Sequence, residues 1–273
     1  MLFRSVAPRF ACFFHEPADN GSTFTAATER LAHIDVHQIS ASARRIVGRR
    51  EFFGKADGAT AGENSGRICY VLYPLDDLGE WIEEAAERFD VTIATVTGMD
   101  WSDDLTPWPA PGEPPGCPPF RGRAPEFLKT LTSKVLPEVE RRLGISSHAE
   151  RTLCGVSLSG LFTLWQWMLD DTFHNIISLS GSFWYAGFAS WITSRPVPSK
   201  SGRAYFLLGN REAYTKVKAF QPVQTDTERI VAYLKGAGID TTFELVPGDH
   251  YQYPEQRLTR SFTHLFSAST PRS

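Results

Sequence analysis

The stretch TLCGVSLSGLF, residues 152–162, presents a serine in a pattern that supports nucleophilic catalysis. Many hydrolases carry the nucleophile in G-x-S-x-G, on a sharp turn from a strand into a helix. Here Gly155 and Ser157 match, but Ser159 stands at the second glycine and Gly160 follows one residue later. A serine hydroxyl is a weak nucleophile and needs a base, an orienting acid and donors for an oxyanion. The pattern predicts acyl transfer if the chain supplies these groups.

The base is expected late in the chain, in the loop that follows the last strand. His250 occupies such a place, after the apolar run FELV and a glycine. A single histidine in a loop is more often a surface residue, but this position favours a general base. The other histidines precede the nucleophile or lie in or beside helices: His15, His33, His37, His148, His174 and His264.

The acid is expected between the nucleophile and the base, after the preceding strand. Glu212 follows the run AYFLLGNR and gives the chain order Ser…Glu…His. Asp249 and Asp226 are alternatives, but a residue adjacent to His250 rarely folds back onto its neighbour's ring. A solvated loop carboxylate is the other interpretation of Glu212.

Two backbone amides are the expected oxyanion donors. The N–H of Leu158 is one, because it follows the nucleophile at a helix N-terminus, where the dipole favours negative charge. The second donor is expected in the DDL segment after the strand ICYVLYPL, at Asp77 or next at Asp76. Both aspartates could instead cap the helix that begins near Gly79.

These groups need a scaffold of alternating strands and helices. Apolar runs predict strands and amphipathic runs predict helices in alternation, which indicates an α/β fold with a mostly parallel central sheet and helices on both faces. The segment 29–53 predicts two early antiparallel strands, and Pro137 should kink the helix over 124–144 unless it starts a new turn. The predicted strands are 67–75, 91–99, 151–156, 175–182, 203–210 and 241–248, and the other helices are 79–89, 160–171, 225–238 and 254–267.

The chain shows no internal repeat or second composition, so it is predicted to form one domain over 23–273 after an N-terminal arm, 1–22. The segment 100–122 holds seven of the 18 prolines and is predicted to be a functional loop on the active-site side.

Charge and cysteine content limit which partners and which cellular compartment are expected for the protein. A net charge of −3 with no dense basic block gives no reason to expect nucleic acid or a membrane surface. The four cysteines, Cys12, Cys69, Cys117 and Cys154, show no C-x-x-C pairing and no metal-ligand spacing. Cys69 and Cys154 lie inside apolar runs and are interpreted as buried free thiols rather than a disulfide. Pro8 and Arg9 interrupt the apolar N-terminus, so no signal peptide is expected and a cytoplasmic location is predicted.

Several motifs in order resemble a known family. The sequence is similar to the esterase-D-like α/β-hydrolases over about residues 66–267, and most of all to the trilactone siderophore esterases that cleave enterobactin, salmochelin and bacillibactin. The resemblance implies that Ser157, Glu212 and His250 are nucleophile, acid and base, and that no cofactor or metal is needed. It rests on YPLDDL, DLTP, GVSLSGLF, SGSFWY, GNRE and PGDH.

The departures from that family bear on the substrate. The family often carries an arginine before its D-x-T-P motif, whereas GMDWSDDLTP has acids and Trp101. Extra carboxylates repel an anionic iron complex, so a neutral ester, macrolactone or hydroxamate ester siderophore is expected. Trp101, Trp108, Trp184 and Tyr185 are candidate substrate-binding residues, with core or loop packing as the other interpretation. Gly181 stands where the family often has proline.

The sequence therefore predicts a serine esterase that acts on a small-molecule ester through an acyl-enzyme. An acyltransferase or a feruloyl-type carbohydrate esterase remains an alternative, since one fold hosts all three activities. A degenerate hydrolase used as a binding module is a further alternative, because Asp77 and Ser159 replace usual glycines. Replacing Ser159 with glycine is expected to change stability by under about 1 kcal/mol.

Overall fold

Parallel strands form the centre of the molecule. The computed structural model describes residues 34–37, 66–72, 79–198 and 201–267. Its seven-stranded sheet has the order β1-β3-β2-β4-β5-β6-β7, in which six strands run parallel and β1 is antiparallel to β3 at one edge. The strands are β1 (Ile34–His37), β2 (Arg67–Leu72), β3 (Thr92–Val96), β4 (Glu150–Val156), β5 (Asn175–Leu179), β6 (Arg203–Gly209) and β7 (Asp240–Val246).

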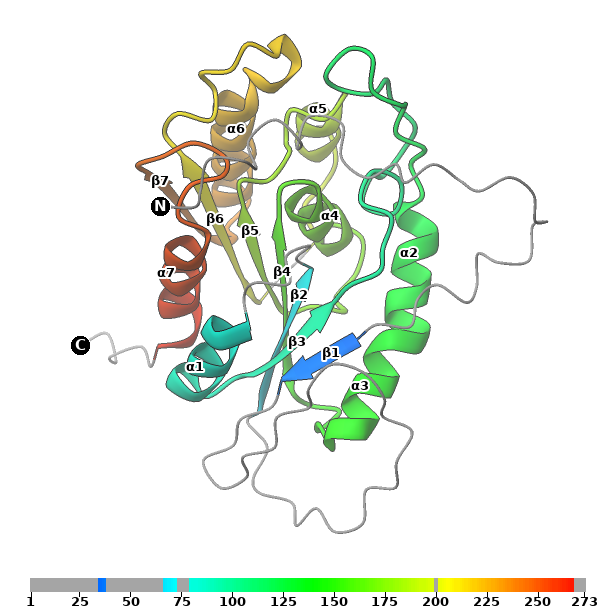
Figure 1. Ribbon diagram of the computed structural model, residues 1–273, viewed down its shortest axis with the longest axis vertical. Helices are drawn as coiled ribbons and strands as arrows, with labels where there is room; N and C mark the ends of the chain where they lie inside the picture. Colours follow the sequence, from blue (N-terminus) through cyan, green and yellow to red (C-terminus); the bar gives the residue numbers. More distant parts are fainter. Residues whose placement is uncertain (1–33, 38–65, 73–78, 199–200, 268–273) are drawn as a thin grey trace, which may run out of the picture.

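Helices cover both faces of this sheet (Figure 1). Alternate residues of a strand point to opposite faces, so Tyr70 of β2 packs in one core cluster and Val71 in the other. The first cluster lies against α2 to α6, and the second lies against α1 and α7. The α-helices are α1 (Gly79–Phe89), α2 (Ala124–Thr130), α3 (Leu136–Leu143), α4 (Leu158–Trp167), α5 (Phe188–Thr193), α6 (Val223–Gly236) and α7 (Pro254–Phe266). The predicted fold, an α/β-hydrolase sheet with helices on both faces, is confirmed.

Proline shapes the long helical segment after the proline-rich loop. A π-helical stretch, η4 (Leu131–Val135), separates α2 from α3. Pro137 lies in the first turn of α3, where its missing N–H needs no intrahelical acceptor. Pro137 was predicted to kink or break the helix unless it started a new turn, and it lies at the start of α3.

Most predicted elements occur within a few residues of their expected bounds. The short helix α5 was not predicted, because its six residues carry too little periodicity to distinguish them from a loop. Of the two early strands, β1 is described and is antiparallel as expected. The N-terminal arm lies outside the described residues, and the division into domains stays a prediction.

The prediction of two buried free thiols is confirmed. Cys69 and Cys154 are free and fully buried in neighbouring strands, and burial raises the pKa of both thiols. Cys117, in contrast, is disulfide-bonded. No assignment for Cys117 followed from the sequence, because spacing along the chain carries no information about which cysteines meet in space.

Candidate active site

The turn at Ser157 joins the end of β4 to the start of α4. Ser157 adopts φ 59° and ψ −120°, a conformation that is sparsely populated for a residue with a side chain. Its N–H donates to the carbonyl of Leu179 at the end of β5, and its own carbonyl accepts from Ser182. A Cβ at Gly155 would lie 2.2 Å from the backbone oxygen of Ser159, so this position has to be glycine. The predicted strand–turn–helix setting of the serine is therefore present.

A chain of hydrogen bonds leads from this serine through His250 to Glu212. The hydroxyl Oγ of Ser157 lies 3.1 Å from Nε2 of His250, and Nδ1 of His250 lies 2.8 Å from Oε2 of Glu212. Because an ionised carboxylate only accepts, the imidazole carries its proton on Nδ1 and accepts from the serine through Nε2. These are the contacts that a nucleophile, a base and an orienting acid require.

Glu212 is buried, with its side chain 2% exposed. Burial alone would raise the pKa of its carboxyl, but hydrogen bonds from His250 and Ser180, together with the nearby charges of His250 and Arg257, outweigh it and lower the pKa. The second oxygen, Oε1, accepts from Ser180 at 2.7 Å, from the N–H of Gly209 at 2.6 Å and from Arg257 at 2.9 Å. The carboxylate of Glu212 is thus ionised and fixed in orientation. In the described part of the chain, the alternatives Asp249 and Asp226 make no hydrogen bond to the ring of His250.

Three polar residues of the site were not identified from the sequence. Ser182 is 1% exposed, and its Oγ lies 3.2 Å from Oγ of Ser157. Ser180 and Arg257 contact Glu212, as described above. A serine pair after a strand and an arginine in a terminal helix are common features, so only the SGSFWY motif could have drawn attention to the two serines.

The unusual Ser159 has a structural role that the sequence did not indicate. Its side chain is fully buried in the first turn of α4. Its Oγ accepts from the N–H of Val156 at 2.7 Å and faces the carbonyl oxygens of Leu72 at 2.6 Å and Val156 at 2.8 Å. The hydroxyl therefore ties the end of β4 to the end of β2, the strand that precedes the predicted oxyanion loop.

The following Gly160 lets α4 pack closely on the sheet. A Cβ there would lie 2.8 Å from the hydroxyl of Ser178 and 3.0 Å from the Cα of Gly181. This close approach explains why the glycine is found one residue later than in the common pattern.

Of the predicted oxyanion donors, Leu158 is the first residue of α4. N–H groups in the first turn of a helix have no intrahelical acceptor and are oriented toward an anion at its N-terminus. Asp76 and Asp77 lie outside the described residues, so the second donor stays a prediction.

The four candidate substrate-binding aromatics have different surroundings. Tyr185 is 1% exposed and its hydroxyl donates to the carbonyl of Trp108, so its ring packs in the core. Trp108 is half-buried and donates through Nε1 to the carbonyl of Ala186. Trp184 is half-buried, two residues after Ser182, with its ring centroid 4.3 Å from that of Phe220. Trp101 is half-buried against the core. Position favours Trp184 for contact with a ligand.

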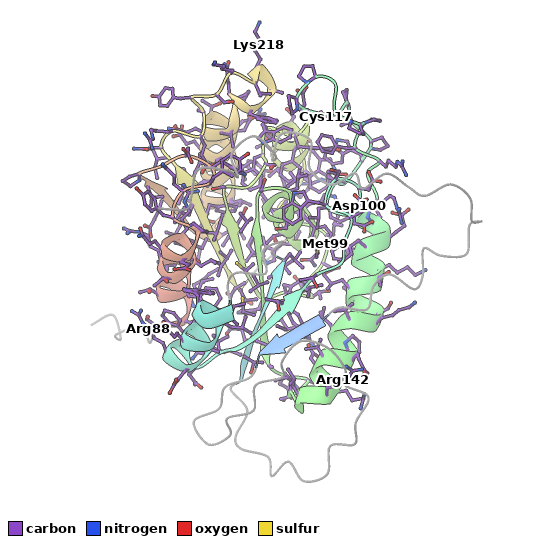
Figure 2. All side chains as sticks on the ribbon, viewed as in Figure 1. Arg88, Met99, Asp100, Cys117, Arg142 and Lys218 are labelled. Atoms are coloured by element: carbon purple, nitrogen blue, oxygen red, sulfur yellow. The ribbon has the colours of Figure 1, made fainter. Side chains whose placement is uncertain are left out.

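The loop 100–122 lies near the carboxyl ends of the central strands. Figure 2 shows Cys117 in this loop at the same end of the molecule as Lys218, whereas Arg88 and Arg142 lie toward the other end. The N–H of Arg123 donates to the carbonyl of Asp103, and Ala110 pairs with Phe120. These bonds close the loop on itself, and Trp108 connects it to the segment that follows Ser182.

Comparison with known proteins identifies the family. A family model described as "Putative esterase" matches residues 73–264, which is more than half of the chain. The chain belongs to this esterase family. Within the curated proteins, it is 26% identical to the uncharacterized protein YbbA of Bacillus subtilis over 164 residues, which are 58% of this chain and 66%, just under two thirds, of that relative.

Solved structures share the fold of this esterase at low identity. The siderophore hydrolase EstB of Aspergillus nidulans is 19% identical, with a TM-score of 0.60 over 78% of this chain and 86% of its own. An IroE-like serine hydrolase of Shewanella oneidensis is 16% identical, with a TM-score of 0.62 over 73% of this chain and 70% of its own. The predicted resemblance to esterase-D-like α/β-hydrolases is confirmed.

The described residues contain neither a membrane-spanning helix nor a cluster of metal ligands. None of the helices in that part of the esterase is long and apolar enough to cross a membrane. Over the same residues, histidine, cysteine and carboxylate side chains form no group of three that could hold a metal ion.

Proposed function

We propose that this esterase hydrolyses an ester or lactone by a serine mechanism with Ser157, His250 and Glu212. The observation that supports the proposal most directly is the unbroken path of hydrogen bonds from Oγ of Ser157 to the buried carboxylate of Glu212. His250 takes the proton of Ser157 as the hydroxyl attacks the carbonyl carbon, and Glu212 stabilises the imidazolium. The N–H of Leu158 is one donor to the oxyanion.

The tetrahedral intermediate then breaks down, and the acyl-enzyme it leaves is hydrolysed, in three further proton transfers through His250. His250 gives its proton to the leaving alcohol, which leaves an acyl-enzyme on Ser157. His250 next removes a proton from a water molecule that attacks the acyl carbon, and the acid is released as the serine recovers its proton. These steps use only the side chains described above.

For the substrate, we propose a neutral siderophore ester or macrolactone. The relatives in fold include a siderophore hydrolase, and the loop 100–122 carries Asp100, Asp103 and Asp104 near the carboxyl ends of the strands. Arg121 and Arg123 pair with Asp103 and Asp104, which leaves this loop without a free basic cluster for an anionic complex.

The cellular location of the protein stays a prediction. A cytoplasmic protein was expected from the sequence, but disulfides are rare in the reducing cytosol. The disulfide of Cys117 therefore weighs against that expectation.

The mechanism is tested by hydrolysis of p-nitrophenyl butyrate and of hydroxamate and catecholate siderophores, with products identified by mass spectrometry. Ser157→Ala should lower kcat/KM by at least about 10³-fold. Ser190→Ala, an exposed serine of α5, is the matched control and should keep the wild-type rate. Equal rates for Ser157→Ala and the wild type would contradict the proposal.

The same product analysis separates the alternative activities. An acyl product on an added alcohol or amine, in competition with water, would identify an acyltransferase. Tight binding of a siderophore without release of any acid would identify a binding module.

A further inference from the structure

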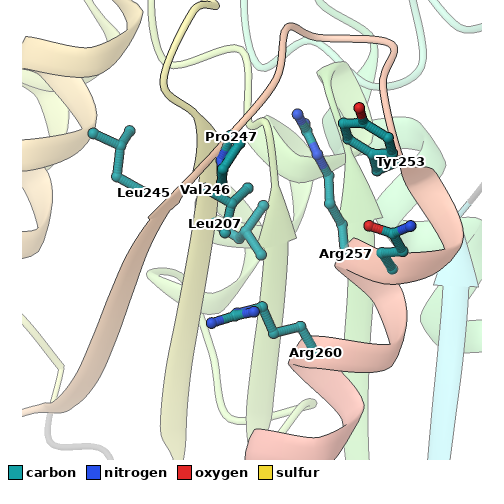
Figure 3. A pocket seen from close by; sticks show the side chains of 8 residues that line it. Leu207, Leu245, Val246, Pro247, Tyr253, Arg257 and Arg260 are labelled. Carbon is teal, nitrogen blue, oxygen red and sulfur yellow. The ribbon is translucent and has the colours of Figure 1, made fainter.

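Arg257 lies in the first turns of α7 and is buried, with its side chain 5% exposed. Figure 3 shows its side chain reaching from α7 toward the loop after β7, while Arg260, one turn along the helix, points across the strands farther from that loop. A buried arginine needs partners for its charge and its N–H groups. Its partners show what this arginine does.

The guanidinium contacts the segments that follow three neighbouring strands. Its Nη1 donates to the hydroxyl of Ser180, after β5, at 2.6 Å and to Oε1 of Glu212, after β6, at 2.9 Å. Its Nη2 donates to the backbone carbonyl of Asp249, after β7 and directly before His250. One rigid, planar group is thus bonded both to the proposed acid, Glu212, and to the backbone directly before the proposed base, His250.

These loops also contact each other, but with fewer side-chain constraints. The N–H of Arg211 donates to the carbonyl of Gly248 at 3.0 Å, and Gly248 donates to the side chain of Asn210 at 3.2 Å. The first of these joins two backbones, the second joins a backbone to a side chain, and Nη2 of Arg211 also donates to Oε1 of Gln252 at 2.7 Å. Among the residues that the structure describes, only Arg257 is bonded at once to the carboxylate of Glu212 and to the residue that precedes His250.

We infer that Arg257 is a positioning residue, whose guanidinium fixes the acid loop relative to the base loop. The inference rests on the proposed function. Removal of this group leaves Oε1 of Glu212 with two neutral donors, and leaves the carbonyl of Asp249 with the N–H of Gln252 at 3.4 Å. Both loops then sample a wider range of distances between Glu212 and His250.

Charge gives a second consequence. Arg257 balances the buried charge of Glu212, so its loss lets the Glu212–His250 pair take up a proton more readily. Three other titratable or charged side chains of the described residues lie near this pair, in the loops after β6 and β7. Arg211 is exposed and bonded to Gln252, Asp249 is half-buried beside the pair, and burial raises the pKa of Tyr251, whose ring lies 5.1 Å from that of His250.

The test compares three variants by steady-state kinetics as a function of pH. Arg257→Met removes the charge and all three bonds and should lower kcat about 10–100-fold, with KM within about 3-fold, because Arg257 is not expected to touch substrate. The acid limb of its pH–rate profile should move up by about 1 pH unit. Methionine has room, since Arg257 borders a cavity of about 440 Å³ between β6, β7 and α7 (Figure 3).

Arg257→Lys keeps the charge but cannot reach all three acceptors. It should lower kcat about 10-fold and leave the acid limb in place, which separates position from charge. Arg260→Met is the matched control on the same helix, since the exposed Arg260 pairs with Glu244, outside the proposed triad, and should be dispensable for kcat. A folded Arg257→Met or Arg257→Lys variant with wild-type kcat and pH profile would overturn the inference.

A proton NMR measurement, which does not depend on turnover, tests the positioning role separately from the proposed function. The Nδ1 proton of His250, bonded to Glu212, should give a downfield proton resonance in the wild type and in Arg260→Met. The resonance should broaden or vanish in Arg257→Met. If Ser157 proves unreactive while the resonance depends on Arg257, the proposed function fails and the positioning role stands; a resonance unchanged in Arg257→Met would contradict the positioning role.

Discussion

The two carboxylate oxygens of Glu212 have different partners: Oε2 lies 2.8 Å from Nδ1 of His250, and Oε1 accepts from the buried hydroxyl of Ser180 at 2.7 Å. Glu212→Gln removes the charge that stabilises the imidazolium and allows the amide NH₂ to face Nδ1, which favours the wrong tautomer. We expect kcat to fall about 10²–10⁴-fold with little change in KM. Steady-state kinetics on a p-nitrophenyl ester measures this. A variant with kcat close to the wild type would show that Glu212 does not orient the base.

The lowered pKa of Glu212 predicts a pH dependence of stability. An unfolded glutamate titrates near about pH 4.3, so the ionised Glu212 stabilises the fold fully above that pH. The stabilisation is lost as the pH falls through the lowered pKa of the folded state. Urea unfolding between about pH 5 and pH 2 should therefore show a steeper loss of unfolding free energy in the wild type than in Glu212→Gln. Parallel curves would contradict the assigned direction.

The hydroxyl of Ser159 predicts a larger cost than the sequence suggested. Ser159→Ala leaves the N–H of Val156 and the carbonyl of Leu72 buried without this partner, so we expect a loss of about 1–3 kcal/mol in the free energy of unfolding. Ser159→Gly should cost at least as much, in place of the change under about 1 kcal/mol expected from the sequence. Ser190→Ala, on the exposed face of α5, is the control and should stay within about 0.5 kcal/mol. Equal stabilities of the two alanine variants would show that the Ser159 bonds add nothing.

The positive φ of Ser157 predicts that the backbone conformation of this residue lowers the free energy of unfolding. A Cβ in this conformation costs about 1–3 kcal/mol, and glycine relieves it. Since Ser157→Ala and Ser157→Gly both remove the hydroxyl, their difference isolates the backbone. We expect Ser157→Gly to be more stable than Ser157→Ala by about 1 kcal/mol in urea unfolding, although glycine loses more entropy on folding. A less stable glycine variant would argue against strain at this turn.

The sequence was sufficient for the fold and for the order of the proposed triad. Apolar runs alternated with amphipathic ones, and Ser157, Glu212 and His250 each followed a strand, so the parallel sheet brings them to one edge. The contacts of Ser182 and Arg257 could not be predicted, because they depend on which loops meet in three dimensions. The prediction for Ser159 considered only the size of its side chain. Its contribution to stability comes from the hydrogen bonds of its hydroxyl to Val156 and Leu72, which the sequence does not show.

The role of Ser157 is tested most directly by covalent labelling. The wild type and Ser157→Ala are treated with a fluorophosphonate, and the adduct is located by mass spectrometry of peptides. The account predicts a single adduct on Ser157 in the wild type, none in Ser157→Ala, and slower labelling in Glu212→Gln. An adduct on another residue, or a wild-type protein that stays unlabelled while it hydrolyses esters, would contradict it.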